Sequence, residues 1–390
     1  MKRSADVVII GGGCMGASVA YHLARRGITD VVLLEREKML GTGSTGRNAG
    51  GVRHQFSNDA NIRLSIESIG LLERFADDVG YTIDFHQDGY LFLLSSQSSV
   101  ETFQENVSLQ RSLGVDVQWL CADEAERLAP GLKADGVIGA TFCERDGIAD
   151  PNGVTMGFAQ SARAAGVVIE RETEVTGIET TGGRIAAVTT PQGRIDTPVV
   201  VNAAGPYARA VGRMAGVDVP VDPYRRHIFI AAFDAPGSDA APVRVPASKI
   251  MVIDFETTFY FHREGAGLLF GMGDPTEPST FDTTVRWDFL PEVTEAAVQR
   301  LPALAEASIS HAWAGLYEMS PDANPIIGAV TDLPGFFLIN GFSGHGFQHS
   351  PAAGRILADV VAGRDPLFDL APFALERFAR TAVSGERYVV

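Results

Sequence analysis

Cysteine is scarce in this chain of 390 residues, which has only three cysteines, Cys14, Cys121 and Cys143. They lie far apart, their number is odd and none forms a C-x-x-C pair, so the sequence excludes a disulfide framework and a cysteine zinc site. We therefore expect no metal centre and a reducing compartment, the cytoplasm.

Basic residues are also few, because 32 Lys and Arg stand against 48 Asp and Glu, which gives a net charge of −16. Such a surface repels phosphate backbones, so we expect no nucleic-acid partner. Residues 7–24 contain no Asp, Glu, Lys or Arg, which fits the length of a membrane span. Asp6 before this stretch and the glycines inside it argue against a span or a secretory signal.

The first 35 residues have the pattern of a β-α-β unit. A short apolar run, Val7–Ile10, predicts a buried parallel strand. The glycine pattern Gly11-x-Gly13-x-x-Gly16 follows, and apolar residues at helical spacing come after it. A second apolar run, Val31–Leu34, ends at Glu35.

Each position of this pattern has a physical reason. Gly11 permits a tight turn, Gly13 lets a pyrophosphate approach the backbone, and Gly16 lets the helix pack closely on the strand. The positive end of the helix faces the phosphates. Glu35 lies 19 residues after Gly16, where a carboxylate can accept hydrogen bonds from ribose hydroxyls. We predict a dinucleotide site rather than a turn without a ligand.

Beyond residue 35 the patterns of helices and strands alternate, without an internal repeat. The block from about residue 217 to 320 is rich in strands. Ser350-Pro351 has the pattern of an N-cap followed by a first helical residue. The expected helices cover residues 60–80, 122–130, 150–166, 290–301 and 350–362. The expected strands include residues 90–94, 167–170, 174–178, 184–189, 198–202 and 336–339.

Residues 41–51 are mostly small, which is unusual so soon after the second strand of a nicotinamide-dependent dehydrogenase. This segment resembles the flavoproteins of the D-amino-acid oxidase superfamily, in particular the branch of sarcosine oxidase, glycine oxidase and dimethylglycine dehydrogenase. Five further segments carry the same resemblance: Asp146–Pro151, Val200–Gly205, Tyr317–Asp322, Gly341–Gln348 and Pro372–Phe378.

The resemblance implies an α/β protein with a Rossmann-like FAD-binding domain and an interleaved, mostly antiparallel β substrate domain. The FAD-binding domain would comprise residues 1–80, 141–215 and 321–390, and the substrate domain residues 81–140 and 216–320. The implied cofactor-binding residues are Gly11, Gly13, Cys14, Met15, Gly16, Glu35, Arg36, Ser44, Thr45, Ala49, Gly50, Gly51, Val175, Ala204, Gly205, Gly344, Gly346, Phe347 and Gln348.

Covalent attachment of the cofactor is disfavoured. Some relatives attach FAD through a cysteine at the position of Gly315, and others through a histidine at the position of Arg47. Neither residue of this chain can form such a bond, so we expect non-covalent FAD.

The substrate side of the resemblance depends on fewer residues. Arg53 matches an arginine that binds the carboxylate of the substrate, although a surface or inter-domain ion pair is the alternative. Gln348 stands where sarcosine oxidases have a lysine as a second carboxylate ligand. Tyr260 matches an aromatic residue near the substrate but is equally compatible with the core. The candidate catalytic residues are Arg53, His54, Tyr260, His345 and Gln348, the two histidines having backbone hydrogen bonding as their alternative role.

Lysine is scarce, with four residues against 28 arginines. In monomeric sarcosine oxidases a lysine over the flavin activates oxygen, and this chain has Leu269 at that position. Loss of a local cation removes electrostatic help for the reduction of oxygen. We therefore expect a dehydrogenase that uses a separate electron acceptor, unless Lys249 reaches the site.

The expected reaction is the FAD-dependent oxidation of a small amine or N-methyl amino acid of the sarcosine, dimethylglycine, proline or glycine type. A hydride passes to flavin N5, and the imine product is then hydrolysed. A hydroxy-acid dehydrogenase on the same fold and a flavin-bearing subunit of a hetero-oligomeric amine dehydrogenase are the alternatives. A nicotinamide-dependent dehydrogenase is the least favoured, and the sequence leaves a homo- or hetero-oligomer open.

Overall fold

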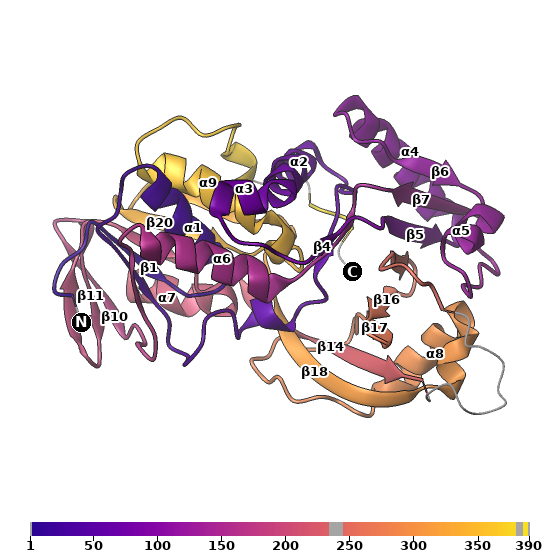
Figure 1. Cartoon of the computed structure of the whole chain (residues 1–390). Helices are drawn as coiled ribbons and strands as arrows, with labels where there is room; N and C mark the ends of the chain where they lie inside the picture. Colours follow the sequence, from indigo (N-terminus) through magenta and orange to yellow (C-terminus); the bar gives the residue numbers. More distant parts are fainter. Residues whose placement is uncertain (1, 234–244, 380–384, 389–390) are drawn as a thin grey trace.

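The computed structural model of the chain describes residues 2–233, 245–379 and 385–388. Two large sheets dominate this part of the molecule, and each has helices of its own (Figure 1). Segments far apart in the sequence contribute to both sheets, so the chain passes between them several times. This interleaved α/β architecture confirms the predicted fold class.

A six-stranded sheet has the strand order β19-β20-β13-β1-β2-β9. Its first two strands in the sequence, β1 and β2, are buried over their full length, as their continuous apolar runs predict. All neighbours pair in parallel except β19, which lies antiparallel at one edge. The strands are β1 (Val7–Ile10), β2 (Val31–Leu34), β9 (Val168–Glu170), β13 (Val200–Asn202), β19 (Ile326–Ala329) and β20 (Phe336–Asn340).

Helix α1 (Cys14–Arg25) packs between α6 (Pro151–Ala164) and α9 (Gly346–Val361), and α2 (Asp59–Glu73) packs on α9 (Figure 1). Their apolar faces form one core with the six-stranded sheet. Two shorter helices belong to the same part of the chain, α3 (Phe75–Val79) and α7 (Ala208–Met214). A three-stranded antiparallel meander covers the other face with β10 (Gly177–Thr181), β11 (Arg184–Thr190) and β12 (Gly193–Asp196).

An eight-stranded sheet has the order β18-β14-β17-β16-β15-β5-β7-β6 and is antiparallel except between β15 and β5. Helices α4 (Gln97–Ser112), α5 (Ala122–Leu128) and α8 (Leu290–Arg300) pack beside it. A small sheet of β3 (Gly51–Val52), β8 (Gly147–Ala149) and β4 (Phe85–His86) completes the structure. The eight strands are β5 (Tyr90–Leu94), β6 (Gln118–Leu120), β7 (Gly139–Cys143), β14 (Asp222–Ala232), β15 (Met251–Asp254), β16 (Phe259–Glu264), β17 (Gly267–Met272) and β18 (Ser308–Met319).

Two expected helices differ from the observed ones. The helix predicted over residues 60–80 is broken at Arg74 into α2 and α3, and Phe75 packs on Phe158, with the ring centroids 4.9 Å apart. Ser350 was expected to cap a helix, but α9 begins at Gly346 and contains Pro351. Proline removes only one N–H donor, so the helix extends back through it to the end of the preceding turn.

The limits of the two domains remain a prediction. Strand β7 (Gly139–Cys143) belongs to the eight-stranded sheet and lies on both sides of the expected limit at residue 141.

Within the described ranges, no helix has the length and apolar character needed to cross a membrane.

Two of the resembling segments meet in a buried ion pair. Asp322 lies between β18 and β19, and Arg377 lies in the last 3-10 helix, at Leu375–Ala379. The Arg377 guanidinium donates through Nε to Asp322 Oδ2 at 2.8 Å and through Nη2 to Asp322 Oδ1 at 2.9 Å. Both side chains are buried, so this bidentate pair anchors the C-terminal segment to the fold.

We expect Asp322→Asn to lower the free energy of unfolding by about 3 kcal/mol, because the substitution leaves the buried Arg377 charge unpaired. Asp59→Asn is the matched control, because Asp59 pairs with Arg63 on an exposed helix face, and its substitution should cost far less stability. Chemical denaturation of the two variants measures both values. Equal losses would show that the Asp322 pair adds no more than a surface pair.

Candidate functional site

A cavity of about 690 Å³ lies between the two large sheets. Its walls include residues at the carboxyl ends of β1, β2 and β13 on one side and residues of β14, β15, β16 and β18 on the other. Ligands of open parallel sheets bind at this end of the strands. The position and size of the cavity fit the predicted dinucleotide.

The glycine loop between β1 and α1 brings backbone segments into close contact. Gly11 has a φ of +113°, and a Cβ at this position would lie 2.3 Å from the Ala203 carbonyl oxygen. A Cβ on Gly16 would lie 1.9 Å from the Gly11 carbonyl oxygen. Gly11 and Gly13 line the cavity, whereas Gly16 lies behind the loop and allows the helix to approach it. Side chains are therefore excluded where the predicted pyrophosphate approaches.

Glu35 closes one end of this loop. Its Oε2 accepts a hydrogen bond from the Gly12 N–H at 2.7 Å, and its Oε1 accepts one from the Glu37 N–H at 2.8 Å. The Arg36 guanidinium lies 3.8 Å from the centre of the Tyr207 ring, which stacks on Phe281. These groups and Val175 line the same end of the cavity, where the sequence predicts the adenosine.

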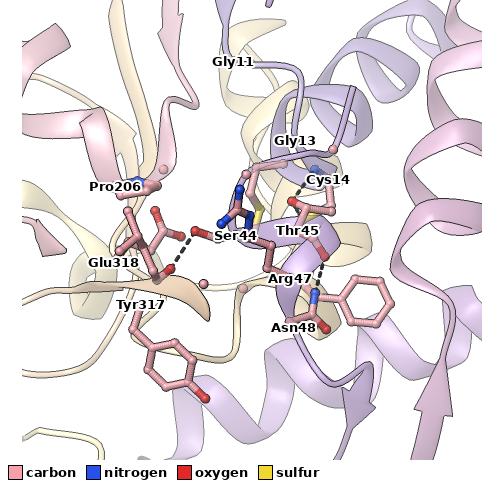
Figure 2. Close-up of a pocket in the computed structure, with 18 of the residues that line it drawn as sticks. Gly11, Gly13, Cys14, Ser44, Thr45, Arg47, Asn48, Pro206, Tyr317 and Glu318 are labelled. Carbon is pink, nitrogen blue, oxygen red and sulfur yellow. Dashed lines mark hydrogen bonds between the residues drawn. The ribbon is translucent and has the colours of Figure 1, made fainter. Parts of the chain in front are cut away.

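The small-residue segment after β2 lies against the start of α1 (Figure 2). The Cys14 N–H donates to Thr45 Oγ1 at 3.1 Å, and the Ser44 hydroxyl donates to the Leu316 carbonyl at 2.6 Å. Burial raises the pKa of the Cys14 thiol to about 11, so it stays protonated. The segment thus connects the glycine loop to β18, and Ser44, Thr45, Ala49 and Gly51 all line the cavity.

Gly315 and Arg47, the two positions that the resemblance associates with covalent attachment, lie side by side. A Cβ on Gly315 would lie 3.0 Å from Cβ of Arg47, and both residues line the cavity. The Arg47 guanidinium donates to the Ala314 carbonyl at 2.8 Å. Neither position offers a cysteine or histidine.

The turn before α9 places a second helix N-terminus at the cavity. Ser343 and Gly344 have φ values of +53° and +98°, and α9 begins two residues later at Gly346. The helix therefore starts closer to the cavity than a start at Ser350 would allow. Gly344, Gly346, Phe347 and Gln348 line the cavity, and the positive end of α9 faces it. Such an end stabilises negative charge on a bound ligand.

Three tyrosines form the end of the cavity away from Arg36. Tyr90, Tyr260 and Tyr317 line it, and each lies against a glycine, so that a Cβ there would come within 2.5 Å of the ring or its hydroxyl. Burial raises the pKa of all three phenols, which are therefore neutral. Tyr260 belongs to this wall, whereas its neighbours Phe259 and Phe261 are in the core.

Arg53 lies in the same part of the cavity and is almost fully buried. Its guanidinium donates to the backbone carbonyls of Gln55 and Tyr388, the latter at 2.6 Å, and stacks over the Phe56 ring at 4.0 Å. No acidic side chain of the described ranges forms an ion pair with it. The alternative of an internal ion pair is therefore not observed there. Gln348 holds the same segment, since its Oε1 accepts a hydrogen bond from the Arg53 N–H at 2.6 Å.

The two candidate histidines have different surroundings. His54 does not line the cavity, and its backbone N–H and Nδ1 contact Asp146 Oδ1 at 2.7 and 2.6 Å. Asp146 also accepts a hydrogen bond from Gln55, so this buried group holds the segment after β3 that carries Arg53. His345 lines the cavity, and neither of its ring nitrogens has a partner among the described residues. Burial lowers the pKa of His345 well below its usual value, so the ring is neutral.

The structure thus brings most of the predicted residues to one cavity. Of the candidate residues, only Gly16, Gly50 and His54 do not line it. Gly50 has a φ of +74°, and a Cβ there would lie 2.6 Å from the Ala149 carbonyl oxygen, so its role is the close approach of two backbone segments.

Sequence reasoning missed Glu318, which lies next to Pro206 in the cavity wall (Figure 2). Its Oε2 is buried and has no hydrogen-bond partner within the described ranges. Burial raises the pKa of Glu318 to about 7, although the N–H groups of Gly341 and Phe342 oppose this shift. The available signal was its place directly after Tyr317 in a segment already singled out.

Without bound cofactor, the protein should lose stability as the pH rises from about 4.5 to about 7. In this range the Glu318 carboxyl is neutral in the folded protein but ionised in the unfolded chain. The unfolded carboxyl ionises near its ordinary pKa of 4.5, whereas the folded one stays neutral up to about pH 7. The stability contributed by the neutral carboxyl is present below 4.5 and lost by about pH 7. The Tm of Glu318→Gln relative to that of the unchanged protein should therefore be higher at pH 8 than at pH 5. Thermal unfolding of the two apoproteins at both pH values measures this difference.

Glu295→Gln is the control for this prediction, because Glu295 is an exposed carboxylate on α8. It should keep a constant Tm difference between the two pH values. If Glu318→Gln also kept a constant difference, the carboxyl would not be neutral in the folded protein.

Comparisons with known proteins identify the cofactor that this family uses. The sequence profile of the FAD dependent oxidoreductase family matches residues 6–360. The chain is 31% identical to mitochondrial dimethylglycine dehydrogenase of Rattus norvegicus, covering 97% of this chain but 45% of that protein. The chain therefore spans about half the length of this relative.

Two further relatives cover nearly the whole chain. It is 27% identical to sarcosine oxidase subunit beta of Rhodobacter capsulatus, over 97% of this chain and 89% of that one. The crystal structure of L-proline dehydrogenase from P. horikoshii superposes with a TM-score of 0.90 at 33% identity, over 97% and 99% of the two chains. This chain belongs to the FAD dependent oxidoreductase family.

Proposed function

We propose that this protein oxidises a small amine that carries a carboxylate, of the sarcosine, dimethylglycine, proline or glycine type. The observation that carries the proposal is the buried Arg53 guanidinium, which lines the cavity without an acidic partner in the described part of the chain. A buried cation of this kind is stabilised by an anion, and a guanidinium binds a carboxylate with two parallel hydrogen bonds. The names of the dimethylglycine and L-proline dehydrogenases support this substrate class.

The surroundings of Arg53 favour a fixed orientation of the substrate. The backbone carbonyls of Gln55 and Tyr388 and the ring of Phe56 hold the guanidinium, and Gln348 holds its backbone. Two of its N–H groups are occupied by these carbonyls, and the others are left for a ligand. A carboxylate bound there fixes the position of the neighbouring carbon atoms, which lowers the entropic barrier of the reaction.

The tyrosine wall favours binding of the amine in its neutral form. Tyr90, Tyr260 and Tyr317 exclude water, and their phenols carry no charge because burial raises each pKa. His345 is neutral as well. Among the described residues, no group in this part of the wall provides the negative charge that would stabilise an ammonium ion. A neutral amine also gives up a hydride more readily.

FAD, when bound, supplies the hydride acceptor at its N5 atom. The glycine loop, Glu35, Arg36, Ser44 and Thr45 would hold it from the pyrophosphate to the adenosine. Gly344, Gly346 and Phe347 would lie at the flavin end, where the N-terminus of α9 stabilises the negative charge that reduction brings. We propose that the cofactor is held without a covalent bond, because Gly315 and Arg47 stand at the attachment positions.

Arg53→Met should weaken binding of an N-methyl amino acid about a hundredfold, because it removes a desolvated charge-assisted pair. The measurement is the concentration of sarcosine, dimethylglycine or proline that half-bleaches the flavin absorption without oxygen. The FAD content of the variant should equal that of the unchanged protein, since Arg53 lies at the other end of the cavity from Arg36.

Arg53→Lys is the matched control, because it keeps the charge but loses the planar pair of donors. The affinity of Arg53→Lys for the amino acid should lie between that of the unchanged protein and that of Arg53→Met. If the Met variant were bleached at the same amine concentration as the unchanged protein, Arg53 would not bind the carboxylate. Bleaching by a 2-hydroxy acid instead of an amine would favour the hydroxy-acid dehydrogenase.

We further propose that the protein passes its electrons to an acceptor other than oxygen. Leu269 is buried in β17 and stands where the resemblance places the lysine of monomeric sarcosine oxidases. Lys249 pairs with Asp84 at 3.1 Å and does not line the cavity. The cations of this end of the cavity, Arg53 and Arg226, are guanidinium groups, which spread their charge over three nitrogens.

Substrate-reduced protein mixed with air-saturated buffer should therefore recover its flavin absorption slowly, over many seconds, while an artificial acceptor such as phenazine methosulfate restores it at once. Stopped-flow absorption measures both. Recovery in air as fast as with the acceptor would identify an oxidase.

The second candidate function is a flavin-bearing subunit of a larger amine dehydrogenase. One observation favours it, the match to a protein named as a beta subunit over 89% of its length. In that case the other subunits supply the electron acceptor. The mass of the native protein, purified with and without co-expressed neighbouring genes, separates this candidate from a self-sufficient enzyme.

A further inference from the structure

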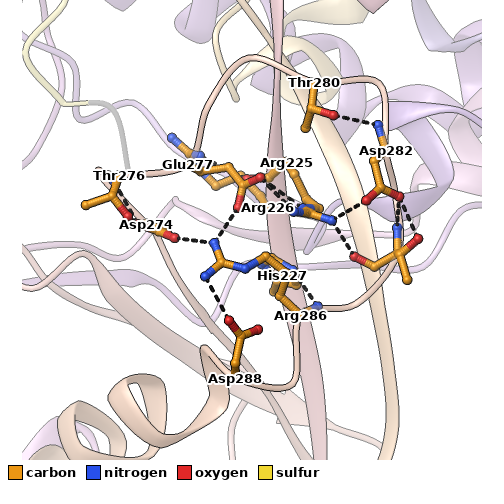
Figure 3. A network of polar contacts seen from close by, with 11 residues as sticks. Arg225, Arg226, His227, Asp274, Thr276, Glu277, Thr280, Asp282, Arg286 and Asp288 are labelled. Atoms are coloured by element: carbon orange, nitrogen blue, oxygen red, sulfur yellow. Dashed lines mark hydrogen bonds and ion pairs between the residues drawn. The ribbon is translucent and has the colours of Figure 1, made fainter.

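Strand β14 carries two consecutive arginines that face opposite sides of the sheet. Arg225 points away from the cavity, where it contacts Glu277 at 2.9 Å and Asp282 at 2.7 Å (Figure 3). Arg226 lines the cavity. The two side chains have the same charge but different partners.

The acids around Arg225 are already engaged. Arg286 contacts Asp274, Glu277 and Asp288 at 2.9, 3.0 and 3.2 Å, so the network of Figure 3 balances Arg225 and Arg286 against four carboxylates. None of these acids forms an ion pair with Arg226. Its charge is not balanced by the network beside it.

Arg226 has hydrogen-bonding capacity left over inside the cavity. Its Nη1 donates to the Arg225 carbonyl at 3.0 Å, while its Nε is buried and has no partner among the residues described. Glu318, the cavity-wall acid that follows Tyr317 in the sequence, accepts hydrogen bonds from the Gly341 and Phe342 N–H groups instead. The Arg226 side chain as a whole is half-buried. A buried donor without a partner, such as its Nε, is costly unless a ligand satisfies it.

Arg226 and Arg53 act on the same tyrosine. The Arg226 guanidinium carbon lies 5.1 Å from the centre of the Tyr317 ring. Burial raises the pKa of the Tyr317 phenol, and the charges of Arg226 and Arg53 both oppose that rise. The two cations therefore lie within electrostatic reach of one place, the part of the cavity enclosed by the tyrosines.

We propose that the substrate carries a second anionic group, a second carboxylate, which Arg226 binds while Arg53 binds the first. The inference rests on the proposed function, because it concerns the same site and the same amine. The substrate class that fits is an amino-dicarboxylate, a secondary amine with an acidic group on each side of the nitrogen or on its side chain. A substrate with one carboxylate leaves the Arg226 charge unbalanced.

Two ligands of matched shape test this inference on the FAD-loaded protein without oxygen. Iminodiacetate has two carboxylates, and N-isobutylglycine replaces one of them by an isopropyl group of similar size. Changes in the flavin absorption give the Kd of each. The unchanged protein should bind iminodiacetate at least about tenfold more tightly than N-isobutylglycine. This ratio corresponds to the free energy of one charge-assisted hydrogen bond.

Arg226→Gln should reduce this preference to less than about threefold, while the Kd of N-isobutylglycine stays the same. Arg226→Lys keeps the charge and should retain a reduced preference. A cofactor phosphate is the other anion that Arg226 could bind, and the Kd of FAD tests this alternative. If Arg226 binds the substrate, the Kd of FAD should be unchanged in both variants. Equal binding of the two ligands by the unchanged protein, an undiminished preference in Arg226→Gln, or weaker FAD binding would each overturn the inference.

The outcome also separates this inference from the proposed function. If both ligands bind equally and Arg53→Met weakens both, the amine and its first carboxylate stand and only the second carboxylate is lost. If neither ligand binds and no amine bleaches the flavin, the proposed function itself is wrong.

Discussion

The close contact of three backbone segments at the glycine loop is the constraint on which the rest of the site depends. Gly16 lets α1 start against Gly11, and Gly11 in turn lies against Ala203 at the end of β13. A methyl group at either glycine would separate the helix from the sheet. Because the helix and the sheet lie in close contact, the N-termini of α1 and α9 face one cavity, and the segment from Ser44 to Asn48 lines it. A long dianionic cofactor fits the electrostatics of such a place.

Much of this site could be predicted because local patterns determine it. The run Val7–Ile10, the glycines and Glu35 are close in sequence and their spacing has one structural solution. Arg226 could not be found in this way, since it looks like an ordinary strand residue until the two sheets meet. Glu318 was missed although it lies in a segment that carries the resemblance, because nothing in the sequence distinguishes it from its neighbours there. The start of α9 was misplaced for a related reason, because the positive φ values of Ser343 and Gly344, not Ser350, set it. Helix α4 was not predicted, since its sequence is mostly polar.

The charges around the cavity divide it into two chemically different parts. At the glycine loop, backbone N–H groups and helix ends offer partial positive charge, whereas burial raises the pKa of the nearby Glu318 carboxyl to about 7. At the tyrosine wall, two guanidinium groups stand among neutral phenols. In a protein with a net charge of −16, such a concentration of positive groups supports the proposal of an anionic substrate.

The central claim is that one cavity holds a whole flavin dinucleotide, with its adenosine at Glu35 and Arg36. Titration of the apoprotein with FAD, and separately with FMN, tests it most directly through the quenching of flavin fluorescence. The account predicts one FAD per chain, binding that is at least a hundredfold tighter than that of FMN (about 3 kcal/mol from the adenosine end), and a colourless chain after denaturation. FMN binding as tight as FAD binding, or yellow colour that stays on the denatured chain, would contradict it.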